Sequence, residues 1–151
     1  MIDGPILFAA VLLCGLLAGN EVATLIAFHP VIRRLPIRAQ VEVEQSLTRL
    51  LGVIMPVYMT ATLVATIGAA FATLGTPAFV FALLAAGAIG LMLVITLTQN
   101  LPLNKRTLDF PPDGDERSWS EIRRRWERIH LVRVILDVSA FACAILALAA
   151  R

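Results

Sequence analysis

Four long hydrophobic stretches occupy most of this chain and limit what it can fold into. They cover approximately residues 6–28, 50–74, 77–98 and 131–149, each about 19 to 25 residues long. At about 1.5 Å per residue, a helix of that length crosses a hydrocarbon core of roughly 30 Å. With 58% hydrophobic residues in a chain of 151, the pattern excludes an ordinary soluble domain. We expect an all-α fold, a membrane-embedded antiparallel four-helix bundle that forms one four-transmembrane-helix domain over residues 1–151.

The charges of the loops indicate how this bundle lies in the membrane. Positive residues lie between the first two stretches and between the last two, whereas the turn at residues 75–77 carries none. By the positive-inside rule, both long loops face the cytoplasm and both termini lie outside. We expect an integral protein of a bacterial inner (plasma) membrane that contacts lipid and binds no nucleic acid. The basic loops can equally be a solvated or headgroup-contacting face and nothing more.

The second and fourth helices are expected to extend beyond the membrane into the cytoplasm. Pro36 can open a helix at its first turn, and the only strong breaker within the helix that follows is Pro56. The fourth helix is expected to begin near Trp119, with Ser118 as its N-cap and Glu121 as the capping-box partner. An exposed connector precedes it, and no internal repeat is evident.

Polar residues inside these stretches are the candidates for function. Glu21 lies in the first stretch, where a carboxylate costs at least about 2–3 kcal/mol unless it is paired or neutralised, so it should face the interior. On the fourth helix, Trp126, His130, Arg133 and Asp137 share one face. Two structural alternatives stay open: Glu21 is protonated or pairs with an arginine only to hold two helices together, or Arg133 and Asp137 neutralise each other.

Two asparagines mark the cytoplasmic end of the third stretch. Asn100, Pro102 and Asn104 are expected to end that helix, with the amides capping freed backbone groups or holding a polar substrate. Gln45 lies on the same side of the membrane, on the second helix. We therefore expect one cavity in the cytoplasmic half of the bundle, lined by Glu21, His130, Arg133, Asn100 and Asn104.

Several of these motifs together resemble a known family. They are Gly15-Leu16-Leu17-Ala18-Gly19, Pro30, Gln45, Pro56, Asn100-Leu101-Pro102-Leu103-Asn104, and Trp126 followed by His130 and Arg133. The chain resembles, over nearly its whole length, the anthrone oxygenase-like family of small four-helix membrane proteins. The most specific parts are residues 100–104 and 126–133. Glu21, His29 and His130 depart from the general pattern of that family.

The resemblance implies an oxygenase that converts an anthrone, a tricyclic phenol-rich ketone with an acidic C–H, to the anthraquinone with O2. No cofactor is expected, because the carbanion of such a substrate can react with O2 without a metal. Glu21 or His130 would be the catalytic base, and Arg133, Asn100 and Asn104 would stabilise the enolate oxygen. Trp126 would stack on the flat aromatic or quinone-like substrate, and Gln45 would help to bind it.

Two other classes of function fit the same residues. His29 and His130 can be the axial pair of a haem, or can ligate a metal together with Glu21. Alternatively, the protein is a non-catalytic membrane subunit or assembly protein in which the polar cluster locks the helices together. A homo-oligomer is compatible with each of these functions.

Overall fold

Four continuous helices account for nearly all of residues 3–150, the part of the chain that the computed structural model describes. In chain order the segments are α1 (Asp3–Ala23), η1 (Thr24–Phe28), α2 (His29–Ile32), α3 (Ile37–Ala72), α4 (Ala78–Ile95), η2 (Thr96–Asn100), α5 (Leu101–Leu108) and α6 (Glu116–Ala149). The segments η1 and η2 are π-helical turns that join their neighbours without a break. All four helices are long and apolar enough to cross a membrane.

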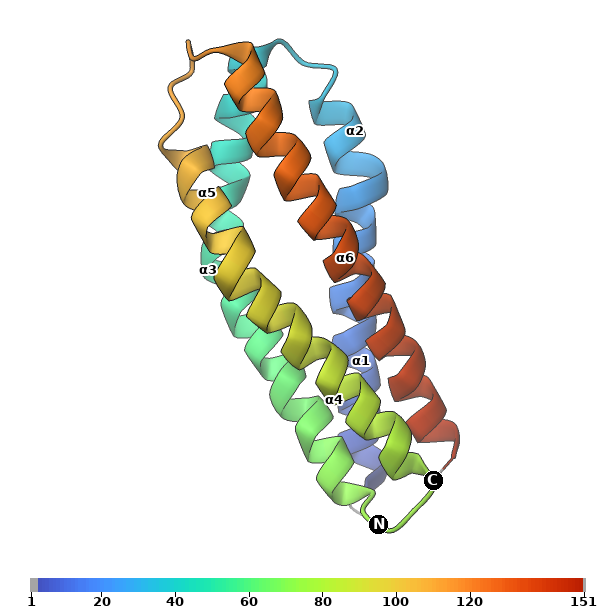
Figure 1. The fold of residues 1–151 in the computed structure, drawn as a ribbon. Helices are drawn as coiled ribbons and strands as arrows, with labels where there is room; N and C mark the ends of the chain where they lie inside the picture. Colours follow the sequence, from blue (N-terminus) through green and yellow to red (C-terminus); the bar gives the residue numbers. More distant parts are fainter. Residues whose placement is uncertain (1–2, 151) are drawn as a thin grey trace.

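The helices form a bundle in which neighbours in the sequence are also neighbours in space. Helix α1 packs against α3 and α6, and α4 packs against the same two helices, so α1 and α4 lie diagonally opposite. Both termini lie at the same end of the bundle (Figure 1). This up-and-down arrangement confirms the predicted all-α antiparallel bundle.

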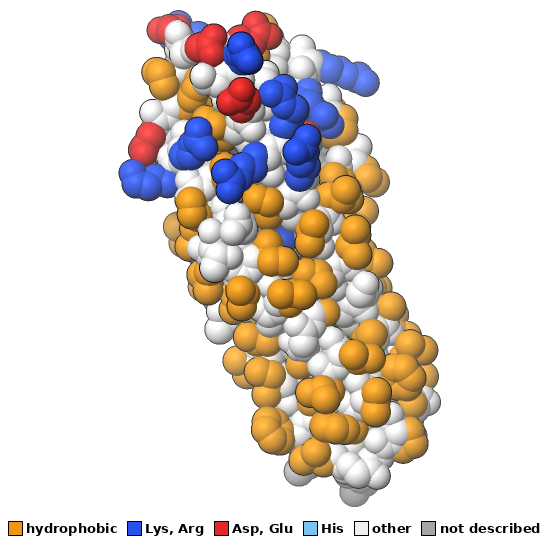
Figure 2. Space-filling model, viewed as in Figure 1, with side chains coloured by type: hydrophobic (Ala, Val, Ile, Leu, Met, Phe, Trp, Pro, Cys, Tyr) orange, Lys and Arg blue, Asp and Glu red, His pale blue; other side chains and the backbone are white. Residues whose placement is uncertain are grey.

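The end of the bundle opposite the termini carries almost all the charge (Figure 2). There α3 and α6 extend past the apolar zone and contact each other through side chains. Trp119 Nε1 donates to Gln40 Oε1 at 3.1 Å, and Arg123 Nη2 lies 2.8 Å from Glu44 Oε1. The predicted extensions of the second and fourth helices are therefore confirmed. That this end faces the cytoplasm stays a prediction.

Helix α6 begins earlier than the sequence indicated. Its N-cap is Asp115, whose Oδ2 accepts hydrogen bonds from Ser118 N at 2.9 Å and Ser118 Oγ at 3.0 Å. The prediction that Ser118 caps the helix was wrong, because the Asp115 carboxylate already satisfies the free N–H of the first turn. These hydrogen bonds also lower the pKa of Asp115.

Each π turn is followed by a proline, and the two turns share one sequence pattern. Thr24-Leu25 and Thr96-Leu97 are each followed by four residues and then Pro30 or Pro102. Proline lacks an N–H and clashes with the carbonyl four residues earlier in a regular α-helix. The π turn avoids this conflict because the N–H just before each proline donates five residues back, to the carbonyl of Thr24 or Thr96.

The hydroxyl groups of the two threonines repeat the pattern. Thr24 Oγ1 donates to Asn20 O at 2.8 Å, and Thr96 Oγ1 donates to Met92 O at 2.9 Å. Because the π turn accommodates Pro102 without a break in the backbone, the third long helix continues to Leu108. The prediction that residues 100–104 end this helix was therefore wrong.

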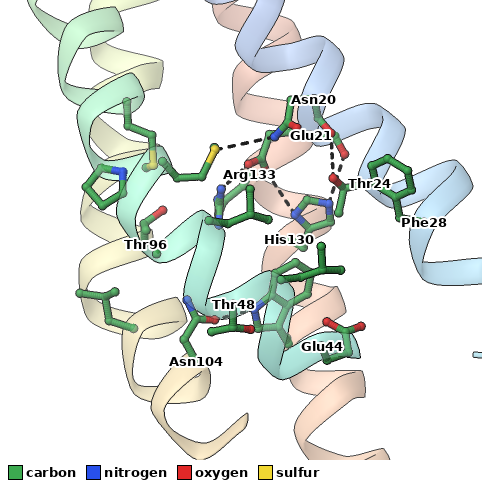
Figure 3. A pocket seen from close by; sticks show the side chains of 18 of the residues that line it. Asn20, Glu21, Thr24, Phe28, Glu44, Thr48, Thr96, Asn104, His130 and Arg133 are labelled. Carbon is green, nitrogen blue, oxygen red and sulfur yellow. Dashed lines mark hydrogen bonds and ion pairs between the residues drawn. The ribbon is translucent and has the colours of Figure 1, made fainter. Parts of the chain in front are cut away.

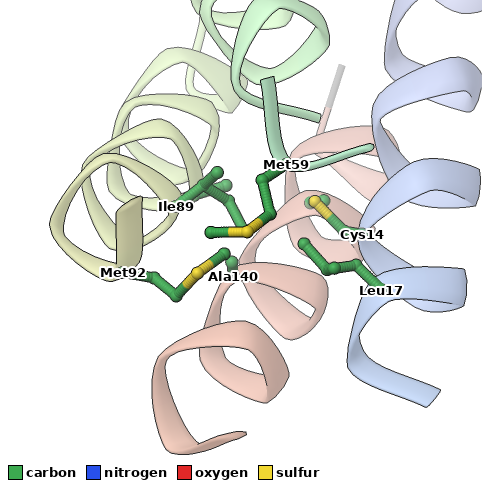
Figure 4. Packing of buried hydrophobic residues seen from close by; sticks show 8 residues of the cluster. Cys14, Leu17, Met59, Ile89, Met92 and Ala140 are labelled. Atoms are coloured by element: carbon green, nitrogen blue, oxygen red, sulfur yellow. The ribbon is translucent and has the colours of Figure 1, made fainter. Parts of the chain in front are cut away.

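Close packing between helices is concentrated in the half of the bundle near the termini. One cluster contains Cys14, Leu17, Met59, Ile89 and Met92, all at most 1% exposed (Figure 4). A second cluster nearer the termini consists largely of alanines. Small side chains let helices approach closely in a bilayer, where no hydrophobic effect drives them together. This half is the rigid part that supports the rest.

The alanine contacts give a first prediction. Ala85 is 1% exposed, so Ala85→Leu should overpack the bundle and destabilise it by about 1–3 kcal/mol. The lipid-facing variant Ala61→Leu is the matched control, since position 61 is exposed. Thermal unfolding in detergent should give a lower midpoint for Ala85→Leu only. Equal midpoints for the two variants would contradict this packing.

Candidate functional site

A cavity of about 210 Å³ lies inside the bundle at the level of the two π turns (Figure 3). Its ionisable lining residues come mainly from the α1–η1–α2 helix and from α6. The facing helices, α3 and α4–η2–α5, contribute mostly apolar side chains: Leu47, Leu51, Met55, Met59, Leu93, Leu97 and Leu101. A ligand in this cavity therefore meets one polar wall and one apolar wall.

Three buried side chains form the inner part of the polar wall, which we name the inner triad: Glu21, His130 and Arg133. Arg133 Nη2 donates to Glu21 Oε1, and His130 Nδ1 lies 3.1 Å from Glu21 Oε2. All three side chains are at most 8% exposed. Arg133 thus pairs with Glu21 on the neighbouring helix α1, and the predicted alternative of an Arg133–Asp137 pair is not what the structure shows.

The partners of His130 fix which of its nitrogens carries the hydrogen. His130 Nε2 lies 3.2 Å from the backbone oxygen of Glu21, and a carbonyl oxygen can only accept a hydrogen bond. Nε2 is therefore the donor, whereas the contact between Nδ1 and Glu21 Oε2 lacks the geometry of a hydrogen bond. When the ring is neutral, Nδ1 keeps its lone pair and is the basic atom of the inner triad.

Trp126 lies at the centre of the polar wall. Its ring stacks on His130 with centroids 4.7 Å apart and meets His29 edge-on at 4.8 Å. Arg123 lies over the same indole at 4.8 Å, and it is one turn before Trp126, whereas His130 is one turn after. Two residues of its own helix thus contact the indole, and Nε1 donates to Asn104 Oδ1 at 2.9 Å.

The sequence did not predict a second cluster, which we name the outer triad: Glu44, His29 and Arg123. Of these three, only His29 was a candidate, as a haem or metal ligand. Arg123 Nη2 lies 2.8 Å from Glu44 Oε1 and 3.2 Å from His29 Nδ1, and Glu44 Oε1 lies 3.3 Å from the same nitrogen. All three residues are buried, and His29 and Glu44 line the cavity. A signal existed in the sequence, because Arg123 precedes Trp126 by three residues and so extends the polar stripe of α6.

Two of the expected site residues lie outside the cavity lining. Asn100 is 1% exposed and its side chain has no hydrogen-bond partner within residues 3–150, but it does not line the cavity. Gln45 Nε2 donates to the backbone oxygens of Thr107, Leu108 and Phe110 at 2.8–3.2 Å, so it caps the end of α5. The expected shared cavity therefore contains Glu21, His130, Arg133, Asn104 and Trp126, without Asn100 or Gln45.

The geometry favours hydrogen-bonding roles for the histidines over metal ligation. Within residues 3–150, no three His, Cys, Asp or Glu side chains are arranged to hold a metal ion. This includes Glu21, His29 and His130, the ligands considered from the sequence. The rings of His29 and His130 meet edge to face, with centroids 5.6 Å apart, and both contact Trp126.

Comparison with known protein families shows which family this chain belongs to. The model of the family described as anthrone oxygenase matches residues 46–143. The chain belongs to the anthrone oxygenase family. No curated protein and no solved structure matches this chain. The matched region includes Asn104, Trp126, His130 and Arg133, whereas Glu21, His29 and Glu44 precede it.

The inner triad gives a second prediction, about stability. Glu21→Gln should leave the buried Arg133 without a counter-charge, at a cost of about 3–5 kcal/mol. Arg133→Met should cost less, because the carboxyl of Glu21 can take up a proton and become neutral. The double variant Glu21→Gln, Arg133→Met should recover most of the stability lost in Glu21→Gln. Unfolding midpoints in detergent test this, and simple additivity of the two single effects would show that the pair is not coupled.

Proposed function

We propose that this protein is an integral membrane oxygenase that converts an anthrone-type phenolic ketone to the corresponding quinone with O2. Family membership and the four membrane-spanning helices support this assignment. The observation that carries it is the inner triad, which brings a basic nitrogen and a guanidinium to a cavity whose facing wall is apolar. A lipid-soluble aromatic substrate fits such a cavity, because its hydrocarbon rings need an apolar contact and its oxygens need donors.

The chemistry begins with removal of a proton from the CH2 group of the substrate. Nδ1 of His130 is the base, and the hydrogen bond from Nε2 to the Glu21 carbonyl holds the ring. The Glu21 carboxylate beside Nδ1 stabilises the imidazolium that forms. The resulting charge is delocalised onto the ketone oxygen as an enolate. Arg133 Nε is buried without a hydrogen-bond partner, and the amide Nδ2 of Asn104 is free to donate because its Oδ1 is used by Trp126. Both groups stabilise the enolate oxygen.

O2 then oxidises the carbanion. The carbon gives up two electrons, a C–O bond forms, and O2 is reduced to a peroxide bound to that carbon. Loss of the second C–H proton breaks the O–O bond and leaves a C=O group, while the leaving oxygen departs as water. The atoms balance as CH2 plus O2 giving C=O plus H2O. Both protons in the water come from the substrate, so His130 can take up and return each one.

A third prediction tests this function. Purified protein in lipid nanodiscs should accelerate O2 uptake and quinone formation from a hydroxylated anthrone such as dithranol, measured against empty nanodiscs. His130→Gln keeps a side-chain donor for the Glu21 carbonyl but loses the basic nitrogen, so the rate should fall by about 10²–10⁴-fold. Ala61→Leu, on the lipid-facing surface, should keep the wild-type rate. A wild-type rate equal to that of empty nanodiscs would refute the proposal.

One observation favours a second candidate, a non-catalytic membrane subunit. Each triad connects α6 to other helices through buried charges, the inner one to α1 and the outer one to α2 and α3. Such contacts can serve only to lock the bundle. In that case the same variants would change unfolding midpoints, and no substrate would be turned over.

A further inference from the structure

The two histidines that line the cavity differ in which ring nitrogen has a hydrogen-bond partner. In His130 the hydrogen is on Nε2, which donates to a backbone oxygen, so a neutral ring has its lone pair on Nδ1. In His29 the arrangement is reversed. Arg123 Nη2 lies 3.2 Å from His29 Nδ1 in a hydrogen bond, and a guanidinium can only donate. Glu44 Oε1 lies 3.3 Å from the same nitrogen, but only the contact with Arg123 has the geometry of a hydrogen bond. We therefore assign His29 Nδ1 as the acceptor and place the hydrogen of the neutral ring on Nε2.

The N–H of His29 has no partner of its own. His29 is 4% exposed, it lines the cavity, and its Nε2 is a buried atom without a hydrogen-bond partner among the residues that the structure describes. Protonating the ring leaves Nε2 a donor, so this nitrogen donates in either state. A buried donor without an acceptor costs about 1–3 kcal/mol unless a ligand or water satisfies it. His29 thus lines the cavity and carries a buried N–H donor that has no acceptor among the described residues.

The surroundings of His29 fix its orientation. Glu44 on α3 and Arg123 on α6 both lie at Nδ1, and Trp126 and His130 on α6 contact the ring. Because Arg123 and Glu44 also pair with each other at 2.8 Å, the outer triad stays charge-neutral without any change in His29. This is the geometry of a fixed donor, which needs no reorganisation when a negative charge develops beside it.

The proposed reaction produces such a charge away from the enolate. O2 becomes a peroxide anion when it adds to the substrate carbon, and the leaving oxygen carries negative charge when the O–O bond breaks. We infer that His29 is a further catalytic residue, whose Nε2–H donates a hydrogen bond to the oxygen derived from O2. This inference rests on the proposed function. Glu44 and Arg123 are positioning residues, since they act through the His29 ring.

His130 alone transfers protons in this scheme, so every proton that is taken up is also returned. His130 takes the first C–H proton and returns it to the peroxide, then takes the second and returns it to the leaving oxygen, which departs as water. His29 donates a hydrogen bond in both steps and transfers no proton. The two rings are neighbours in the lining of the cavity, with centroids 5.6 Å apart.

The experiment separates the C–H step from the O2 step. Under anaerobic conditions in D2O, exchange of the CH2 protons of dithranol measures the base alone. In air, quinone formation measures the whole reaction. The variants are His29→Leu, which removes the donor, His29→Gln, which keeps an N–H donor, and His130→Gln as the matched control at the base. All are assayed in nanodiscs, with empty nanodiscs subtracted.

His29→Leu is expected to exchange protons at close to the wild-type rate and to form quinone about 10²–10³-fold more slowly, the loss typical of one removed donor. His29→Gln should recover much of the quinone rate. His130→Gln should lose both activities. Each His29 variant leaves the Glu44–Arg123 pair in place, so folding should persist, and an unchanged unfolding midpoint checks it.

Other outcomes overturn the inference in distinguishable ways. If His29→Leu loses exchange and quinone formation equally, or loses neither, His29 does not act on the oxygen. If His29→Gln is as slow as His29→Leu, the N–H donor is not what matters. If the His29 variants fail to fold, Glu44→Gln with Arg123→Met removes both charges and should slow only the O2 step. If the wild type gives neither exchange nor quinone, the proposed function itself fails.

Discussion

The buried pair of Glu21 and Arg133 is the interaction on which the rest of the structure depends. Each charge alone would be expensive in the apolar interior of a membrane bundle, so the two must meet. Their meeting fixes α1 against α6 at one depth and one rotation. With that contact fixed, His130 lies on the carboxylate and Trp126 lies against His130. The positions of the other side chains of the polar wall thus depend on this one ion pair.

The space for the cavity has a different origin. Tight packing of alanines near the termini draws the four helices together, whereas the π turns and their prolines lie at the level where the cavity opens. A π turn widens a helix locally and often marks a functional site. The bundle therefore combines a closely packed half that supplies rigidity with a wider half that supplies room. The charged extensions of α3 and α6 close the far end with the outer triad.

The sequence predicted the features that depend on long-range composition or on large energetic costs. Four apolar stretches predicted four helices, and the cost of a carboxylate in lipid placed Glu21 in the interior. It did not predict features that depend on how helices meet. Pro102 was interpreted as a helix end because a π turn cannot be distinguished from a break by local residue type. Glu44 and Arg123 were not predicted as site residues, because their burial depends on the contact between two helical extensions.

The repeated Thr-Leu pattern has a consequence for the lining of the cavity. Helices α1 and α4 run in the same direction on opposite corners of the bundle, and each carries a π turn, a threonine and a proline at equivalent positions. Two helices at diagonally opposite corners therefore share the same local device, and residues of both line the cavity. Three residues before the first threonine is Glu21, and three before the second is Leu93; both line the cavity. At equivalent positions of two helices with the same local backbone, the cavity therefore meets a carboxylate on one side and a hydrocarbon side chain on the other.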